Sequence, residues 1–113
     1  MKIENQFKAV KDIVKPVEPI SHYAENLTPI GNILWRQRAQ VQGRVTAIKS
    51  AAKGSAPLLQ VEVWDESGGV TLHFLGRREI AGLEVGTQIR AEGMVGEEDG
   101  ALTILNPSYQ LLV

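Results

Sequence analysis

Hydrophobic and polar residues alternate along most of the chain from Gln37 onward, and two of the alternating segments carry a glycine on their apolar side. The first is Val41-Gln42-Gly43-Arg44-Val45, and the second is Ala91-Glu92-Gly93-Met94-Val95. A glycine inside a strand leaves a buried face without a side chain, so it usually marks a tight bend or the close approach of another backbone. The two segments therefore predict two strands of a small, strongly coiled barrel.

The first of these strands is predicted to be long and half buried. Ala39, Ala47 and the apolar residues between them take the core face, while Arg38 and Arg44 occupy outward positions. Residues 49–57 combine Lys, Ser, Gly and Pro, which is the composition of a loop. We therefore expect the strand to end before this segment.

A hairpin is predicted next, because residues 59–64 and 70–74 alternate on either side of Glu66-Ser67-Gly68-Gly69. If these four residues form the turn, the register follows. Val63 then faces Leu72 on the inside. Trp64 pairs with Thr71, and Glu62 pairs with His73, on the outside.

The rest of the chain predicts two more strands and several connections. Ile89 to Val95 forms the fourth strand, residues 97–100 a tight acidic turn, and Leu102 with Ile104 the core face of a fifth strand. Residues 76–86 are expected to form a short helical turn and a bend closed by glycine.

An amphipathic helix is predicted before the strands. Ile3, Phe7, Val10 and Val14 recur at helical spacing, and Pro16 ends the pattern. Residues 15–27 read as an extended linker with one possible helical turn after Ser21. Thr28-Pro29 has the pattern of an N-cap followed by proline at the first helical position.

Five short strands without strand–helix–strand crossovers indicate an all-β antiparallel sandwich or barrel. A chain of 113 residues has room for one domain with one modest core. We therefore expect an N-terminal helix and linker over residues 1–34 and a barrel over residues 35–113.

The composition narrows the range of functions. Twelve Lys and Arg residues against 13 Asp and Glu residues give a net charge of −1, so the chain lacks the basic excess of a typical nucleic-acid binder. The absence of cysteine excludes disulfides, thiolate catalysis and cysteine-based zinc sites. The chain shows no apolar leader segment and no apolar run long enough to span a membrane, so we expect a soluble cytoplasmic protein without a membrane partner.

No pattern of residues argues for an enzyme. The two histidines, His22 and His73, lie in different segments without a third ligand at a helpful spacing, so a metal site is not expected. Ser67 lies in a hairpin turn and not at a strand-to-helix elbow, and the glycines at 82 and 86 lack the Lys-Ser/Thr of a phosphate loop. We expect no catalytic residue and no cofactor.

Residues 37–112 resemble the OB-fold nucleic-acid-binding family, in particular small stand-alone OB proteins of actinobacteria, the OB wedge of the RecG helicase and anticodon-binding OB domains. The resemblance rests on the two glycine strands, on Val63-Trp64-Asp65-Glu66-Ser67-Gly68-Gly69-Val70-Thr71-Leu72, and on Phe74-Leu75-Gly76, Leu83-Glu84-Val85-Gly86 and Asn106-Pro107-Ser108-Tyr109. It implies a five-stranded Greek-key barrel in which the first strand lies beside both the second and the fourth. It also implies binding of single-stranded or structured DNA or RNA.

Single-strand binding without sequence preference needs aromatic faces for stacking and a basic groove along the backbone. Trp64 is the best stacking candidate; the alternative is that it packs under the N-terminal helix. Trp35 and Tyr109 are expected to anchor the ends of the barrel. The candidate nucleic-acid-binding residues, including those beside Trp64, are Arg36, Arg38, Arg44, Lys49, Lys53, Trp64, His73, Arg77, Arg78 and Arg90.

Two functions are compatible with these features. The first is a non-catalytic nucleic-acid-binding module that uses the outer face of strands one to three and the loop at residues 49–57. The second is a protein-interaction or oligomerisation module, which pairs with itself or docks on a larger nucleic-acid enzyme through the N-terminal helix. The acidic turn Glu97-Glu98-Asp99 would repel phosphates and favours the second function.

Overall fold

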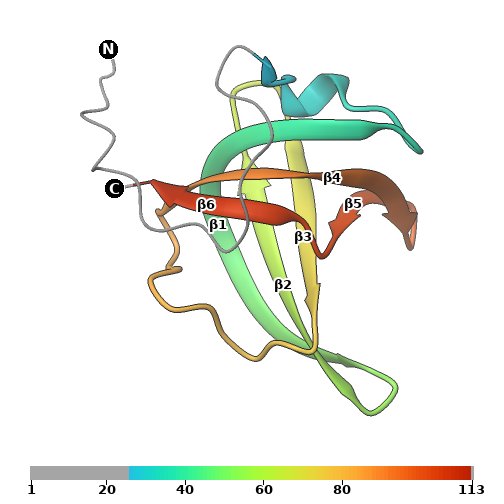
Figure 1. The fold of residues 1–113 in the computed structure, drawn as a ribbon, viewed down its shortest axis with the longest axis vertical. Coiled ribbons are helices and arrows are strands. Elements are labelled where there is room, and N and C mark those ends of the chain that lie inside the picture. Colours follow the sequence, from blue (N-terminus) through green and yellow to red (C-terminus); the bar gives the residue numbers. More distant parts are fainter. Residues whose placement is uncertain (1–25, 113) are drawn as a thin grey trace.

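The computed structural model describes residues 26–112, and these residues form an almost entirely β structure (Figure 1). A short 3-10 helix, η3 (Ile30–Asn32), precedes six strands. The strands are β1 (Arg38–Lys53), β2 (Ala56–Trp64), β3 (Gly69–Leu75), β4 (Gln88–Glu98), β5 (Ala101–Leu105) and β6 (Ser108–Leu112). The predicted helix over residues 3–14 and the possible turn after Ser21 lie outside the described residues.

Five of the strands close into a ring. Their order is β1-β2-β3-β5-β4, and β4 pairs again with β1. Residues 38–44 of β1 pair with β4 and residues 44–53 pair with β2, so the single long strand serves two neighbours. All pairs in the ring are antiparallel except β3 and β5, which are parallel. The prediction of an all-β, barrel-like fold is confirmed.

The strand β6 is an addition to the five predicted strands. It continues the chain beyond Pro107 and pairs with residues 88–92 of β4, while β5 pairs with residues 95–98 of the same strand. Tyr109 on β6 is buried and its ring meets Phe74 edge-on at 5.4 Å between centroids. This contact anchors the last strand to the core, as expected for Tyr109.

The interior of the ring is filled by aliphatic side chains from every strand, which supply the hydrophobic stabilisation of the fold. The largest fully buried side chains are Val41, Val45, Val61, Val63, Leu72, Ile89, Val95 and Ile104. Ile30 and Ile33 are also buried in this core, although they belong to the segment that precedes the first strand. The turn around η3 therefore packs as part of the barrel.

Both glycines of the paired motifs point inward, as predicted. Gly43 and Gly93 lie in the adjacent strands β1 and β4, where Gly43 pairs with Ile89 and Gly93 pairs with Ala39. A Cβ atom on Gly43 would overlap the backbone carbonyl of Trp64, whereas one on Gly93 would lie 2.7 Å from Cγ2 of Ile104. Close backbone approach therefore explains Gly43, and side-chain packing explains Gly93.

The inward position predicted for Ala47 is wrong, because β1 contains a bulge. Val45 pairs with Val63 but Ala47 already pairs with Glu62, which leaves Thr46 as the extra residue. Side chains after Thr46 therefore change faces. Ile48 packs against the core, and Ala47 and Lys49 turn to the outside.

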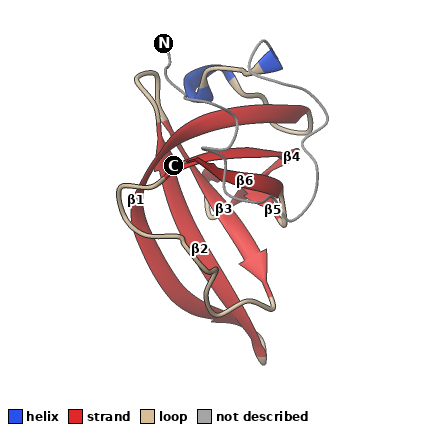
Figure 2. Cartoon of the chain, turned by 60° about the vertical axis from the view of Figure 1, so that its left-hand side comes forward, coloured by secondary structure: helices blue, strands red, loops and turns tan. Residues whose placement is uncertain are grey.

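The loop predicted at residues 49–57 is also wrong. β1 continues to Lys53 and β2 begins at Ala56, so that Ser50 pairs with Leu59 and Ala52 with Pro57. The two strands form a long hairpin that bends away from the ring (Figures 1 and 2). Because this hairpin extends past the core, its side chains need not alternate between apolar and polar, and its composition resembles that of a loop.

The register predicted between β2 and β3 is wrong by two residues. Trp64 pairs with Gly69, Glu62 with Thr71, and Val63 with Val70. The turn consists of residues 65–68, and it is closed by a hydrogen bond from the Asp65 N–H to the Gly68 carbonyl at 3.0 Å. A slip of two residues preserves the alternation, so each side chain keeps its predicted face but has a different partner.

Two smaller predictions are corrected. Residues 76–87 form no helix but a chain of turns, with Leu83 donating to the Ile80 carbonyl at 3.1 Å. Pro29 and not Thr28 precedes the first residue of η3, and no side chain of its own segment caps that helix. Among the described residues, no helix is long and apolar enough to cross a membrane.

Candidate functional site

The outer face of β1, β2, β3 and β5 presents its side chains in rows across the sheet, because the registers of the strands align. One row joins Arg44, Trp64 and Gly69. The next contains Ala47, Glu62, Thr71 and Thr103, and a third contains Lys49, Gln60, His73 and Leu105. This face therefore changes from aromatic and basic at one end to polar in the middle.

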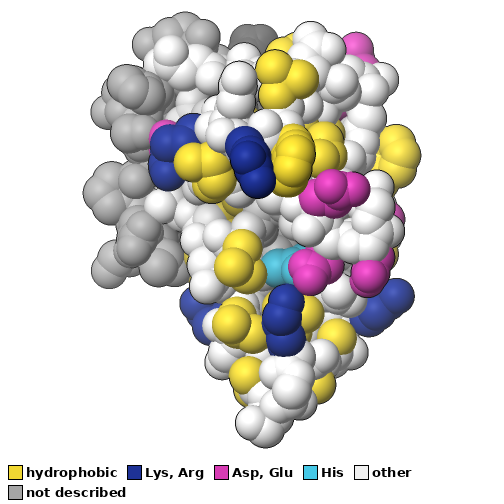
Figure 3. Space-filling view, turned by 90° about the vertical axis from the view of Figure 1, so that its right-hand side faces the viewer, with side chains coloured by type: hydrophobic (Ala, Val, Ile, Leu, Met, Phe, Trp, Pro, Cys, Tyr) yellow, Lys and Arg dark blue, Asp and Glu magenta, His cyan; other side chains and the backbone are white. Residues whose placement is uncertain are grey.

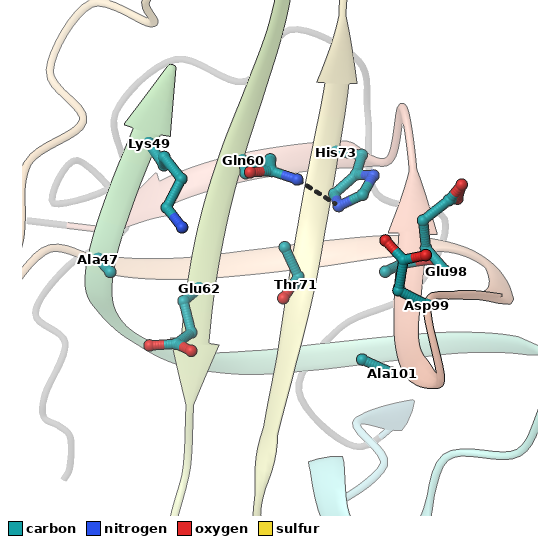
Figure 4. A pocket seen from close by; sticks show the side chains of 10 residues that line it. Ala47, Lys49, Gln60, Glu62, Thr71, His73, Glu98, Asp99 and Ala101 are labelled. Carbon is teal, nitrogen blue, oxygen red and sulfur yellow. Dashed lines mark hydrogen bonds between the residues drawn. The ribbon is translucent and has the colours of Figure 1, made fainter. Parts of the chain in front are cut away.

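A groove of about 270 Å³ lies over the middle rows, between β1 and the β4–β5 turn (Figures 3 and 4). Ala47, Ala101 and the two threonines line it with small side chains, which makes the face hollow. The lining residues are Ala47, Lys49, Gln60, Glu62, Thr71, His73, Glu98, Asp99, Ala101 and Thr103. Acidic side chains outnumber basic ones in this set.

His73 lies at the bottom of the groove and is buried, with 8% of its surface exposed. Its Nε2 lies 3.4 Å from Nε2 of Gln60, the residue opposite it on β2 (Figure 4). Burial lowers the pKa of His73, and the positive charge of Lys53 lowers it further, while Glu98 raises it and is outweighed. This shift favours the neutral imidazole, which offers one donor and one acceptor.

Trp64 forms the aromatic end of the face. The side chain is 48% exposed, and its indole lies over Gly69, because a Cβ on that glycine would come within 2.7 Å of ring atom Cδ2. Arg44 is the cross-strand partner of Trp64. Both line a shallow hollow whose other lining residues are Gln42, Gly43, Thr46, Asp65, Glu66 and Gln88. One side of the indole is thus supported by backbone, and the side chain remains accessible beside a guanidinium group.

Asp65 holds the turn that follows Trp64. Its carboxylate accepts hydrogen bonds from the N–H of Ile30 (2.9 Å), from the N–H and Oγ of Ser67 (2.7 and 2.6 Å) and from the N–H of Gly68 (3.1 Å). Burial acts to raise the pKa of Asp65, but these hydrogen bonds outweigh it and the pKa lies below its ordinary value. The carboxylate therefore joins the Trp64 end of the sheet to η3.

Several of the predicted binding residues are engaged within the protein. Arg90 is buried, and its Nε donates to Oε1 of Gln42 at 2.9 Å. Arg38 forms an ion pair with Glu92 at 3.8 Å, and Lys53 forms one with Glu98 at 3.2 Å.

The remaining predicted residues lie apart from the groove. Arg36 stacks on Trp35, with its guanidinium carbon 4.4 Å from the centroid. Arg77 and Arg78 belong to the β3–β4 connection, and Arg78 lines a separate hollow against the β1–β2 hairpin. Of the ten predicted residues, the structure thus brings Arg44 together with Trp64, and Lys49 together with His73.

Several polar and small groove residues were not among the predicted binding residues. Gln60, Thr71 and Thr103 line the groove, and Ala47 and Ala101 leave it open. Gln60 and Thr71 could have been identified from their outward positions in the alternating pattern. Ala47 could not, because the bulge in β1 reverses the face on which it lies. Thr103 could not, because it joins the groove only through the parallel pairing of β5 with β3. Trp35 was expected to anchor the barrel end, yet 52% of its surface is exposed.

Over residues 26–112, no group of three or more His, Cys, Asp or Glu side chains is placed to hold a metal ion. The chain matches no protein-family model and no curated protein.

Proposed function

We propose that the protein is an OB-fold module that binds single-stranded nucleic acid without catalysing a reaction. The five-stranded ring supports this assignment, because OB folds bind oligonucleotides over strands two and three, between the loops that join strands one to two and four to five. The groove of this chain occupies that position over β2 and β3.

The observation that carries the proposal is the pairing of Trp64 with Arg44. A half-exposed indole supported on one side by Gly69 offers a rigid surface on which a base stacks. The guanidinium group of Arg44 lies directly across the strand pair and neutralises a neighbouring phosphate. Stacking together with phosphate neutralisation is the combination used for sequence-tolerant binding.

The groove beside Trp64 contributes hydrogen bonds more than charge. Gln60, Thr71 and Thr103 present donors and acceptors that match the edges of bases. Glu62, Glu98 and Asp99 repel phosphates, so a bound strand turns its bases toward the groove and its backbone toward Arg44 and Lys49. The carboxylates also make the binding weak.

Fluorescence anisotropy of a labelled single-stranded oligonucleotide, measured over a series of salt concentrations, tests the proposal. A strand of about 15 nucleotides is long enough for one OB fold. We expect Trp64→Ala to weaken binding by roughly 5- to 150-fold, since stacking of one base is worth about 1–3 kcal/mol. Trp35→Ala is the matched control, because it removes an indole of similar exposure that does not lie on the β2–β3 face.

Arg44→Ala is expected to weaken binding and to reduce the slope of log K against log salt by about 0.7 for a single strand. Arg78→Ala serves as its control, because it removes a guanidinium group from the β3–β4 connection, in a separate hollow. Absence of binding by the wild-type protein at low salt would refute the proposed function. Equal losses of oligonucleotide affinity in Trp64→Ala and Trp35→Ala would show that the oligonucleotide does not bind on the β2–β3 face.

A further inference from the structure

Three carboxylates line the groove, and they differ in how far they are already engaged. Oε1 of Glu62 accepts a hydrogen bond from Thr46 at 2.9 Å, and Glu98 forms an ion pair with Lys53 at 3.2 Å. Asp99 makes no side-chain hydrogen bond or ion pair with the described residues. Both of its carboxylate oxygens are therefore available as acceptors.

The turn that joins β4 to β5 holds Asp99 in place. β4 ends at Glu98 and β5 begins at Ala101, so Asp99 and Gly100 alone form the turn, with φ values of +53° and +84°. Positive φ at both central residues is the pattern of a tight hairpin turn, in which Asp or Asn followed by Gly is preferred. The backbone of Asp99 thus has little freedom, and Figure 4 shows its side chain beside that of Glu98 at the edge of the groove.

His73 supplies a hydrogen-bond donor at the bottom of the groove. The side-chain nitrogen of Gln60 can only donate, so Nε2 of His73, 3.4 Å away, is the acceptor, and the proton of the neutral ring lies on Nδ1. His73 is more than nine-tenths buried, yet its Nδ1 has no partner among the described residues and is not fully enclosed by protein atoms. Figure 4 shows this second nitrogen toward the side where Glu98 and Asp99 lie.

The groove has room for one flat ring system. Its small lining side chains, among them Ala47, Thr71 and Ala101, leave about 270 Å³ open above the sheet. Sites for drug-sized ligands are larger, at about 300–1,000 Å³. The space therefore suits a single base and not a folded segment of another protein.

One donor beside a pair of acceptors discriminates among ligands. A basic peptide would satisfy Asp99 but would place a second donor against the N–H of His73, because Lys and Arg side chains carry no acceptor. The Watson–Crick edge of guanine has one acceptor, O6, next to two adjacent donors, N1–H and N2–H. Adenine and cytosine have a donor group next to an acceptor, and thymine and uracil have one donor between two acceptors. Guanine alone offers two adjacent donors to one carboxylate.

We infer that the groove is a subsite for guanine, in which Asp99 accepts from N1–H and N2–H and Nδ1–H of His73 donates to O6. The inference rests on the proposed function, since the base belongs to a strand held by Trp64 and Arg44. A carboxylate repels phosphates but forms strong hydrogen bonds with the donor edge of a base. This accounts for acidic residues on a face that binds nucleic acid.

Fluorescence anisotropy with the full chain and four labelled DNA strands tests the inference. Each strand has about 15 nucleotides, in which every third base is guanine, adenine, hypoxanthine or 7-deazaguanine and the others are thymine. We expect the guanine strand to bind about fivefold or more tightly than the adenine strand, the lower end of the discrimination by one bidentate contact. Hypoxanthine lacks the N2 amino group and should lose most of this preference. 7-Deazaguanine differs from guanine on the opposite edge and should keep it.

Asp99→Asn removes the bidentate acceptor without disturbing the turn, because Asn is equally suited to the positive φ at this position. It should bring the ratio of guanine to adenine affinity close to that of a site without base preference. Glu97→Gln is the matched control, since it removes a negative charge from the same end of β4 but outside the groove lining. Loss of a negative charge strengthens binding of every strand, so the ratio and not the affinity reports the contact.

His73→Phe keeps a ring of similar size without a donor, and it should lower the same ratio. Circular dichroism checks that each variant is folded. An undiminished guanine preference in Asp99→Asn overturns the inference, as does loss of the preference with 7-deazaguanine, which would show that the other edge of the base is read. Binding of all strands with equal affinity refutes this inference alone, whereas absence of binding to every strand refutes the proposed function.

Discussion

Trp64 and Trp35 are both about half exposed and both have an arginine as a neighbour, yet their surroundings differ. Trp64 lies on a strand, supported by Gly69, next to a hollow face lined with hydrogen-bonding groups. Trp35 lies in a strained turn with a guanidinium group already stacked on its ring, among exposed Leu and Met side chains. Exposure alone does not distinguish them.

The neighbours decide what each indole is suited to contact. A supported ring beside small polar side chains leaves room for a flat base and for its polar edge. A ring that a guanidinium group already covers in part, among exposed apolar side chains, leaves less room for a base. The surroundings of Trp64 therefore agree with the proposed contact with a nucleic acid, whereas those of Trp35 do not.

Gly43→Ala is expected to have the largest effect, and to act on the Trp64 region. A Cβ at this position would overlap the Trp64 carbonyl and come within 2.8 Å of Cγ1 of Val63, so β2 must move. Overpacking of this kind costs about 2–3 kcal/mol of unfolding free energy. Urea denaturation followed by circular dichroism measures the loss.

Gly96→Ala, on β4 near Trp35, is the matched control for Gly43→Ala. Its Cβ would meet only Oγ1 of Thr103 at 3.9 Å, an ordinary contact. We expect its stability to change by less than about 0.5 kcal/mol. Equal destabilisation by the two substitutions would contradict the distinction between backbone approach at Gly43 and open space at Gly96.

Asp65→Ala should be the next most harmful substitution, because Asp65 joins the turn after Trp64 to the segment that leads to Trp35. The carboxylate accepts four hydrogen bonds, but it is partly exposed, so we expect a loss of about 1–2 kcal/mol. Glu66→Ala, which alters the adjacent exposed residue, should be nearly neutral.

The effect of Asp65 depends on pH with a definite sign. Its pKa is lowered in the folded protein, so its contribution is complete above its ordinary value of 3.8 and is lost as the pH falls through the lower folded pKa. The difference in stability between the wild type and Asp65→Ala should therefore shrink in acid. A difference that stays constant down to pH 2 would argue against this role for the carboxylate.

Gly69→Ala should displace the Trp64 indole at a smaller cost, about 1 kcal/mol, because a side chain and not the backbone must move. In a Trp35→Phe background, the fluorescence reports on Trp64 alone, since the chain has two tryptophans. We expect iodide to quench the Trp64 fluorescence to a different extent in the variant. We also expect a several-fold loss of oligonucleotide affinity. Unchanged affinity would show that the support of Trp64 by Gly69 is not needed for binding.

His73→Gln is expected to have the smallest effect, below about 1 kcal/mol. His73 lies in the groove, and its cross-strand neighbour on β5 is Leu105. Its pKa is lowered in the fold, so the unfolded chain takes up a proton first and stability falls as the pH drops below 6.5.

The pH dependence of stability in the His73→Gln variant distinguishes the contribution of His73 from that of His22. The variant should lose less stability than the wild type between about pH 7 and the lower folded pKa of His73. Thermal denaturation over this range, with His22→Gln as the control, measures the difference. An unchanged pH profile in His73→Gln would contradict the assignment.

The side that a residue faces was predictable from the sequence at most strand positions that border the core. Gly43, Val61 and Ile104 all face inward as their alternation indicates, because burial of one face determines the period of two. The hairpin at residues 49–57 was not predictable, since it extends past the core and needs no apolar face. The outward position of Ala47 was not predictable either, because the bulge that causes it is not marked by any change in composition.

The candidate site was predicted in part. Trp64 and Arg44 could be identified as outward residues of neighbouring strands, and the structure makes them direct partners. Their setting could not be predicted, because the support by Gly69 depends on the length of the turn at residues 65–68. The acidic character of the groove depends on the β4–β5 turn, which lies far from β2 in the sequence.

The amino-acid sequence by itself determined the alternating strands, the inward glycines and the absence of cysteine chemistry, because these follow from local pattern and composition. The tertiary structure alone decided the registers and the closure of the ring through β1. It also decided that Arg44 lies across from Trp64, because this depends on pairing between residues that are distant in the chain. The two indoles, similar in the sequence, therefore acquire different surroundings only when the barrel closes.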